Sequence, residues 1–178
     1  EKTVLTNARL KQCDFSDAVL VGVNFSEAEL QGCRFKKAVL NNANLEGLEL
    51  LGCDFRMTKM IEANLSHANL TEVDIRGANL TKANLTAANL TTALMDMTTL
   101  DGAILRQAQA AGTHFTGSSM QGTDASRAEF VAAKLKGIRN WHSILLASTN
   151  LTGVCMAPKG FIEYARQFGP VIKKSVTI

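Results

Sequence analysis

A strict five-residue period in side-chain size constrains this sequence more than any other feature. From Leu5 to Leu105, every fifth residue is Leu, Ile, Phe or Met. A small or compact residue, most often alanine, lies two positions before nearly all of them. Neither a helix, which repeats at 3.6 residues, nor a flat strand, which repeats at two, has this period.

The period predicts a chain that turns once in every repeat. Each repeat then contains a short extended segment and a corner, so that the large and the small residue both point inward. Such residues are buried only if successive turns of the chain stack at about 4.8 Å, as neighbouring strands do. Cys-x-Phe triplets begin at Cys13, Cys33 and Cys53, at intervals of 20 residues. This spacing predicts four pentapeptides in each coil.

The stretch "EANLSHANLTEVDIRGANLTKANLTAANLTTA" at 62–93 repeats a motif close to A-[DN]-L-x-x. In this motif the chain resembles the pentapeptide-repeat family over about residues 3–156. The resemblance implies an all-β solenoid, a right-handed quadrilateral parallel β-helix of about eight 20-residue coils. We therefore expect one β-helical domain over residues 1–156.

The five-residue register shifts once. A polar residue, Asn140, stands where a large apolar one is expected, and the period resumes one position later at Trp141. One inserted residue within 136–145 explains the shift.

The last residues, 157–178, leave the period and predict a short C-terminal capping helix and a tail. Pro158 suits the first turn of a helix. Phe161, Ala165 and Phe168 would share one face, which would cover the last coil. No comparable cap is visible before Leu5, so an end-to-end homodimer is one possible assembly.

The three cysteines of the triplets are predicted to belong to the core. Stacked coils place their thiols about 5 Å apart, and the outer two about 10 Å apart. One metal ion needs all its thiolates within about 2.3 Å, and a disulfide between parallel side chains has unfavourable geometry. We expect a structural ladder of small and aromatic residues and neither a metal nor another cofactor. Its members are Cys13, Cys33, Cys53, Phe15, Phe35 and Phe55.

Seven triplets, six Asn-Leu-[Ser/Thr] and one Asn-Phe-Ser, are glycosylation sequons in form, but the repeat itself produces them. Asn24, Asn44, Asn64 and Asn84 recur at 20 residues and predict a stacked amide ladder. Glycans there would obstruct the packing of coils.

Charge and motifs argue against several functions. Residues 1–135 carry 13 basic and 15 acidic side chains, and residues 136–178 carry six and one. This balance disfavours a dedicated nucleic-acid binder. No apolar run is long enough to cross a bilayer, so membrane insertion is not expected.

No nucleophile motif, phosphate loop or His ligand spacing occurs, and a filled core leaves no substrate cavity. We expect a non-enzymatic protein, with a cytoplasmic location favoured over secretion.

One surface is a candidate for binding a protein partner. Asp14, Arg34 and Asp54 are predicted to form an outward salt-bridge ladder of small energetic value. Beside it the sequence places apolar residues at positions that are usually polar, rimmed by basic ones, a composition typical of interfaces. The alternative is that β-branched residues simply suit stacked strands. The candidate residues are Val19, Val21, Val39, Ile61, Arg34, Lys36, Lys37 and Arg56.

The leading functional prediction is a protein–protein interaction module that presents a rigid β-helical surface. The family resemblance suggests a second possibility, protection of type II topoisomerases such as gyrase by mimicry of DNA, although this body is near neutral and shows no long loop. A third is a secreted bacterial effector, or a module of one, that binds host proteins. Residues 106–128 replace several core residues by Ala, Ser or Thr, which predicts looser packing or a recognition site there.

Overall fold

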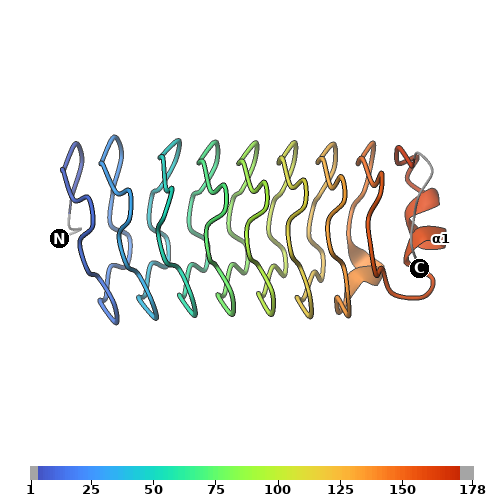
Figure 1. Cartoon of the computed structure of the whole chain (residues 1–178), viewed down its shortest axis with the longest axis horizontal. Coiled ribbons are helices and arrows are strands. Elements are labelled where there is room, and N and C mark those ends of the chain that lie inside the picture. The colour runs from blue at the N-terminus through green and yellow to red at the C-terminus, as the bar shows by residue number, and fades with distance from the viewer. Residues whose placement is uncertain (1–3, 173–178) are drawn as a thin grey trace.

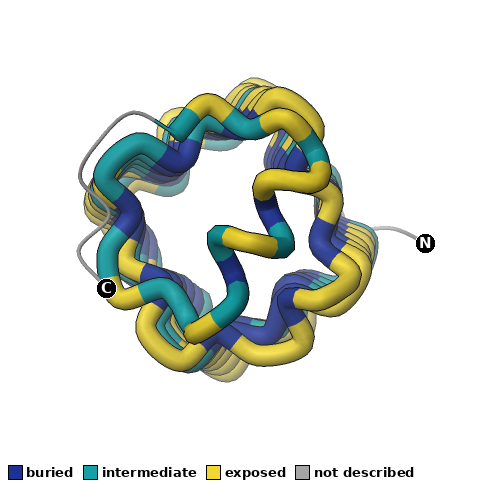
Figure 2. The backbone as a smooth tube through the Cα atoms, turned by 90° about the vertical axis from the view of Figure 1, so that its right-hand side faces the viewer, coloured by how far each residue is buried: buried dark blue, intermediate teal, exposed yellow. Residues whose placement is uncertain are grey.

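The computed structural model of the chain, described here for residues 4–172, is a four-sided rod of stacked coils (Figures 1 and 2). Parallel β-bridges join successive coils on all four faces, as in Val4–Asn24 and Arg9–Glu29. The predicted right-handed quadrilateral β-helix is therefore confirmed. In Figure 2 the corners are mostly exposed, and buried residues lie along the sides between them.

Each corner is a tight turn with a left-handed residue at its third position. In the turn of residues 5–8, the Ala8 N–H donates to the Leu5 carbonyl at 3.2 Å, and Asn7 has φ 59°. The positive φ directs the Asn7 N–H to the Ser26 carbonyl of the next coil, at 3.0 Å. Left-handed backbone costs a non-glycine residue about 1–2 kcal/mol, and this inter-coil hydrogen bond offsets the cost.

The core consists of vertical rows of equivalent positions. Phe15, Phe35 and Phe55 stack with ring centroids 5.1 and 4.9 Å apart, so the predicted aromatic ladder is present. Beside it, the Cys33 Sγ donates to the Leu10 carbonyl at 2.7 Å and the Cys53 Sγ to that of Leu30 at 3.0 Å.

In residues 106–128, hydroxyl groups take the place of the thiols as donors to carbonyls of the preceding coil. Thr113, Ser118 and Thr123 donate to carbonyls of the preceding coil at 2.6, 2.7 and 2.8 Å. These side chains and the small Ala110 are all buried. The Ser and Thr residues are thus accommodated as hydrogen-bond donors to the backbone.

The amide ladder is also present. The Asn44 Nδ2 donates to the Asn24 Oδ1 at 3.2 Å, and contacts of 3.4 and 3.3 Å extend the row through Asn64 to Asn84. Each Oδ1 also accepts the N–H of the residue two positions later, which fixes the corner that follows, as Asn64 does with Ser66 at 3.1 Å. The sequon asparagines of this row are thus engaged within and between coils.

The register shift lies where a 3-10 helix, η1 (Trp141–Ser143), widens one coil. Ser119 still bridges Arg139, at the ordinary coil spacing, whereas Asp124 bridges Leu145, one position later than that spacing predicts. Asn140 precedes η1 with a left-handed φ of 56°, and Trp141 returns to the core.

The C-terminal end of the rod is covered by the α-helix α1 (Phe161–Arg166), which crosses the last coil in Figure 2. Phe161 and Ala165 are buried, as predicted for the cap. The expectation that Pro158 occupies the first turn was wrong. Gly160, with φ 85°, is the N-cap, because the chain must first turn inward from the wall of the rod.

The two ends of the rod differ. Leu5, Leu10, Phe15 and Leu20 at the N-terminal end are only partly buried, whereas the C-terminal coil lies beneath α1. Neither helix within residues 4–172 has the length and apolarity that a membrane span needs.

Candidate partner-binding surface

The candidate surface lies on the N-terminal coils, around the corner formed by residues 16–17, 36–37 and 56–57. The outward rows on either side of this corner begin at Asp14 and at Val19 and recur once in every coil. Arg34 belongs to the first of these rows, whereas Lys36 and Lys37 lie on the corner itself. The coil repeat thus brings together residues that are far apart in the sequence.

The apolar part of this surface is smaller than the sequence suggested. Val19 and Val39 are bridged neighbours in one row, and 76% of Val19 is exposed. Val21 and Ile61 lie on the next corner, but Asn41 stands between them. The Asn41 Oδ1 accepts the Ile61 N–H at 3.0 Å, and Ile61 is half-buried. The exposed apolar residues are therefore Val19 and the neighbouring Val21, with Val39 half-buried beside Val19.

The predicted salt-bridge ladder of Asp14, Arg34 and Asp54 was wrong in its second step. Arg34 pairs back to Asp14, with its Nη2 at 2.9 Å from Oδ2. Asp54 pairs instead with Arg56 on the corner of its own coil, at 2.6 Å. The reason is geometric: Arg56 reaches Asp54 through two parallel N–H donors, Nε and Nη2, a bidentate arrangement that Arg34 cannot share.

These contacts hold the carboxylates ionised. The Ser16 side chain and N–H, followed by Arg34, lower the pKa of Asp14 to about 2. The Arg56 guanidinium lowers the pKa of Asp54, and Asp54 in turn raises the pKa of Arg56. Most of these side chains are substantially exposed, so their pairs contribute little to stability.

Two methionines on the same corner were not singled out from the sequence. Met57 and Met97 are 56% and 63% exposed. Each lies beside the corner glycine of the next coil: a Cβ on Gly77 would be 3.6 Å from the Met57 Cγ, and one on Gly117 only 2.6 Å from the Met97 Sδ. Aligning the sequence coil by coil would have shown them, because large apolar residues alternate there with glycine.

The other candidate chemistry is structural. Burial raises the pKa of Cys33, and that of Cys53 to about 12, so both are neutral thiols that donate to carbonyls. Across residues 4–172 no three His, Cys, Asp or Glu side chains are grouped in a way that would hold a metal ion.

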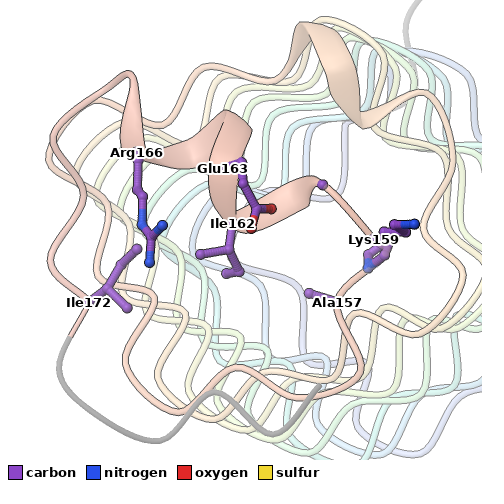
Figure 3. A pocket seen from close by; sticks show the side chains of 8 residues that line it. Ala157, Lys159, Ile162, Glu163, Arg166 and Ile172 are labelled. Carbon is purple, nitrogen blue, oxygen red and sulfur yellow. The ribbon is translucent and has the colours of Figure 1, made fainter.

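A pocket of about 540 Å³ lies at the C-terminal end, between α1 and the segments that lead into and out of it (Figure 3). Its wall is mainly apolar, with Ala157, Ile162 and Ile172 facing the cavity and the charged Lys159 and Arg166 at its rim. Its described lining residues include no Ser, Cys or His that could act as a nucleophile or base.

A more polar groove of about 480 Å³ lies on the corner formed by residues 106–107, 126–127 and 147–148. Arg106 is held there by Asp124. The pKa of Asp124 stays below its ordinary value because, although burial opposes this, Ser126 and Arg106 donate to the carboxylate. Arg127 lines the same groove.

Comparison with known proteins agrees with this architecture. The model of a pentapeptide repeat region matches residues 28–105, and the model of pentapeptide repeats in eight copies matches residues 2–36, 95–130 and 103–139. No curated protein sequence gives a significant match.

Solved structures with the same fold include two trypsin-treated variants of QnrB1, a plasmid-mediated fluoroquinolone resistance protein. One is 16% identical, with a TM-score of 0.69, covering 98% of this chain and 88% of QnrB1. The other is 19% identical, with a TM-score of 0.51, covering 98% and 86%. HetL, from the cyanobacterium Nostoc and involved in the regulation of heterocyst differentiation, is 26% identical over 86% of this chain and 70% of HetL, with a TM-score of 0.37.

Proposed function

This chain belongs to the pentapeptide-repeat family, and from that premise we propose that it is a non-enzymatic module that binds a protein partner through its N-terminal coils. The observation that supports the proposal is the bridged Val19–Val39 pair beside Lys36 and Lys37, in which Val19 is exposed and Val39 is half-buried. Apolar side chains surrounded by charged ones are typical of protein interfaces.

The rigidity of the rod favours the same function. Each interior coil is hydrogen-bonded to the coils before and after it, so the surface side chains are presented on a backbone that needs no ordering when a partner binds. This lowers the entropic cost of association. The two cavities give a weaker case for catalysis, because neither brings together a nucleophile, a base and an oxyanion donor among the residues described.

Protection of a topoisomerase by DNA mimicry is the second candidate, and the charges support it less. A DNA mimic needs a continuous acidic surface. Here Arg34, Arg56 and Arg76 interrupt the carboxylates of Asp14, Asp54 and Asp74. The likeness to QnrB1, at 16% and 19% identity, supports the fold alone.

The test is a pull-down from bacterial and host-cell lysates with the chain and two variants. In Val19→Asp/Val39→Asp/Lys37→Glu the candidate surface is changed. The matched control, Leu51→Asp/Ile104→Asp/Lys82→Glu, makes the same change in charge at exposed positions on other corners and faces. Circular dichroism checks that all three proteins are folded.

We expect a partner that the chain and the control retain and the surface variant loses. Equal retention by all three would reject this surface. Capture of gyrase or topoisomerase IV would favour the second candidate instead.

A further inference from the structure

The coil repeat gathers unpaired cations along one edge of the rod. We define the basic edge as the corner at residues 16–17, its equivalents in each coil up to 136–137, and the outward rows that begin at Asp14 and Val19. It carries nine basic side chains and five acidic ones. The basic ones are Arg34, Lys36, Lys37, Arg56, Lys59, Arg76, Lys134, Lys136 and Arg139.

The diagonally opposite edge has the reverse balance. It comprises the corner at residues 6–7 and its equivalents, with the rows that begin at Val4 and Arg9, and it holds three basic and six acidic side chains. They are Arg9, Arg106, Arg127, Glu27, Glu29, Glu46, Glu49, Asp124 and Glu129. The rod is therefore polarised across its width, which the near-neutral total of the repeats does not reveal.

Ion pairing accentuates this polarity. On the opposite edge, Arg9 forms an ion pair with Glu29 at 3.8 Å, and Arg106 forms one with Asp124. On the basic edge, the arginines of the N-terminal half pair with carboxylates. Its five lysines form no ion pair with any residue in 4–172, and the Nε of Arg139 donates to the Gly117 carbonyl at 3.1 Å.

The free cations form two groups with an apolar stretch between them. Lys36, Lys37 and Lys59 lie on the second and third coils, and Lys134, Lys136 and Arg139 on the seventh. Lys59 and Arg139 share one row, four coils apart, which is about 19 Å at about 4.8 Å per coil. Between the groups lie the exposed Met97 and the half-buried Leu94.

We propose that the basic edge binds an acidic protein segment whose carboxylates are grouped at its two ends and whose middle is apolar. A separation of about 19 Å corresponds to about 13 residues of α-helix or about six of extended chain. The two lysine groups then attract the ends, and Met97 and Leu94 contact the apolar middle, Met97 through its adaptable thioether side chain.

A nucleic acid fits this edge less well. Its phosphates carry charge along the whole backbone and favour an uninterrupted row of cations. The basic edge instead has Asp74, Asp96 and the exposed Met97 between its lysine groups. Asp96 lies 4.0 Å from His114, and Arg76 is paired with Asp74. Within the described residues, this central part therefore offers no free lysine or arginine to a phosphate.

The inference rests on the proposed function, because it specifies the chemistry of the partner and extends its contact beyond the valines. The probe is a fluorescent helical peptide of about five turns, with glutamates in its first and last turns and leucines in the middle. Its binding is measured by fluorescence anisotropy at low and at high NaCl concentration. The comparisons are the same peptide with Gln for Glu and a DNA duplex of similar length.

We expect the acidic peptide to bind at least about tenfold more tightly than its Gln counterpart at low salt and to weaken at high salt, because salt screens exposed charges. Lys59→Glu/Lys136→Glu should weaken binding by about tenfold or more. Lys82→Glu/Arg127→Glu, which makes the same change in charge on other edges, should change it less than about twofold.

Equal loss in both variants, or no preference for the acidic peptide, would overturn the inference. Tighter binding of the duplex would also overturn it, in favour of a nucleic-acid ligand. If the peptide fails while Val19→Asp/Val39→Asp/Lys37→Glu still loses a lysate partner, the acidic-partner inference fails and the proposed module stands. If the peptide binds as expected but the valine variant retains every partner, the valine surface is rejected and the basic edge stands.

Discussion

At the scale of single residues, the small inward position serves as a hydrogen-bonding site as well as a filler. Alanine fills it in most repeats. Where Cys33, Cys53, Thr113 or Ser118 replaces alanine, the side chain donates to a carbonyl of the preceding coil. Sulfur and hydroxyl donors are thus equivalent here, which explains why a polar residue is tolerated in a dry core.

This equivalence predicts the reactivity of the thiols. Cys33 and Cys53 are buried and burial raises their pKa, so neither should react with a disulfide reagent at mildly alkaline pH until the protein unfolds. Cys155 and Cys13 are half-buried and should react in the native state. Thiol titration followed by mass-spectrometric mapping gives the order, and rapid native labelling of Cys53 would contradict it.

Asp14 gives a prediction about pH. Its depressed pKa means that its contribution to stability is complete above the ordinary value of 3.8 and is lost as pH falls toward about 2. Ser16→Ala should raise the pKa of Asp14 toward 3.8, because Ser16 is the largest cause of the shift. NMR titration of the carboxyl carbon measures this, with Ser26→Ala as control. An unchanged pKa in Ser16→Ala would show that the backbone N–H of residue 16 and Arg34 hold the charge without the hydroxyl group.

At the scale of the repeating element, each row acts as a ladder whose members depend on the coils above and below. Phe35 is fully buried between two parallel rings, whereas Phe15 at the end of the same ladder is only partly buried. The same substitution should therefore have different costs along one row.

Phe35→Ala should destabilise the protein by about 3–5 kcal/mol, the usual cost of removing a buried phenylalanine. Phe15→Ala should cost clearly less, because fewer atoms contact its ring. Equilibrium urea unfolding measures both, and Phe35→Leu should recover part of the loss. Equal costs for Phe35→Ala and Phe15→Ala would mean that the first coil is as tightly packed as the second.

At the scale of the whole molecule, the rod is a one-dimensional stack in which each coil contacts only its neighbours. Its C-terminal end depends on α1, where Phe161 is buried and the Tyr164 hydroxyl donates to the Ile144 carbonyl at 2.9 Å. The Trp141 and Phe161 rings, 5.6 Å apart, connect the cap to the coil that contains the register shift.

Phe161→Asp should therefore unfold the rod from this end. We expect faster amide hydrogen exchange from about residue 141 onward and little change in residues 45–100, because distant coils share no contacts. Gln167→Asp, at an exposed position of the same segment, should leave exchange unchanged. A uniform increase along the chain after Phe161→Asp would show that the coils unfold as one cooperative unit.

The sequence by itself determined the coil. Side-chain size at every fifth position indicates which residues are inside, the Cys-x-Phe spacing indicates the length of the coil, and Asn140 indicates the shift. These features depend only on burial, which is a local property of each position. The sequence predicted that a helix caps the rod but not the residue at which this helix begins, because the chain must turn inward before α1 can form.

Only the tertiary structure decided the surface. Asp54 pairs with Arg56 and not with Arg34, and Asn41 separates Val21 from Ile61. Five lysines that form no ion pair within residues 4–172 lie on one edge. Such outcomes depend on the directions of long side chains at the corners and on competition among neighbours in adjacent coils. A period in the sequence specifies which residues are neighbours, but not which of them will pair.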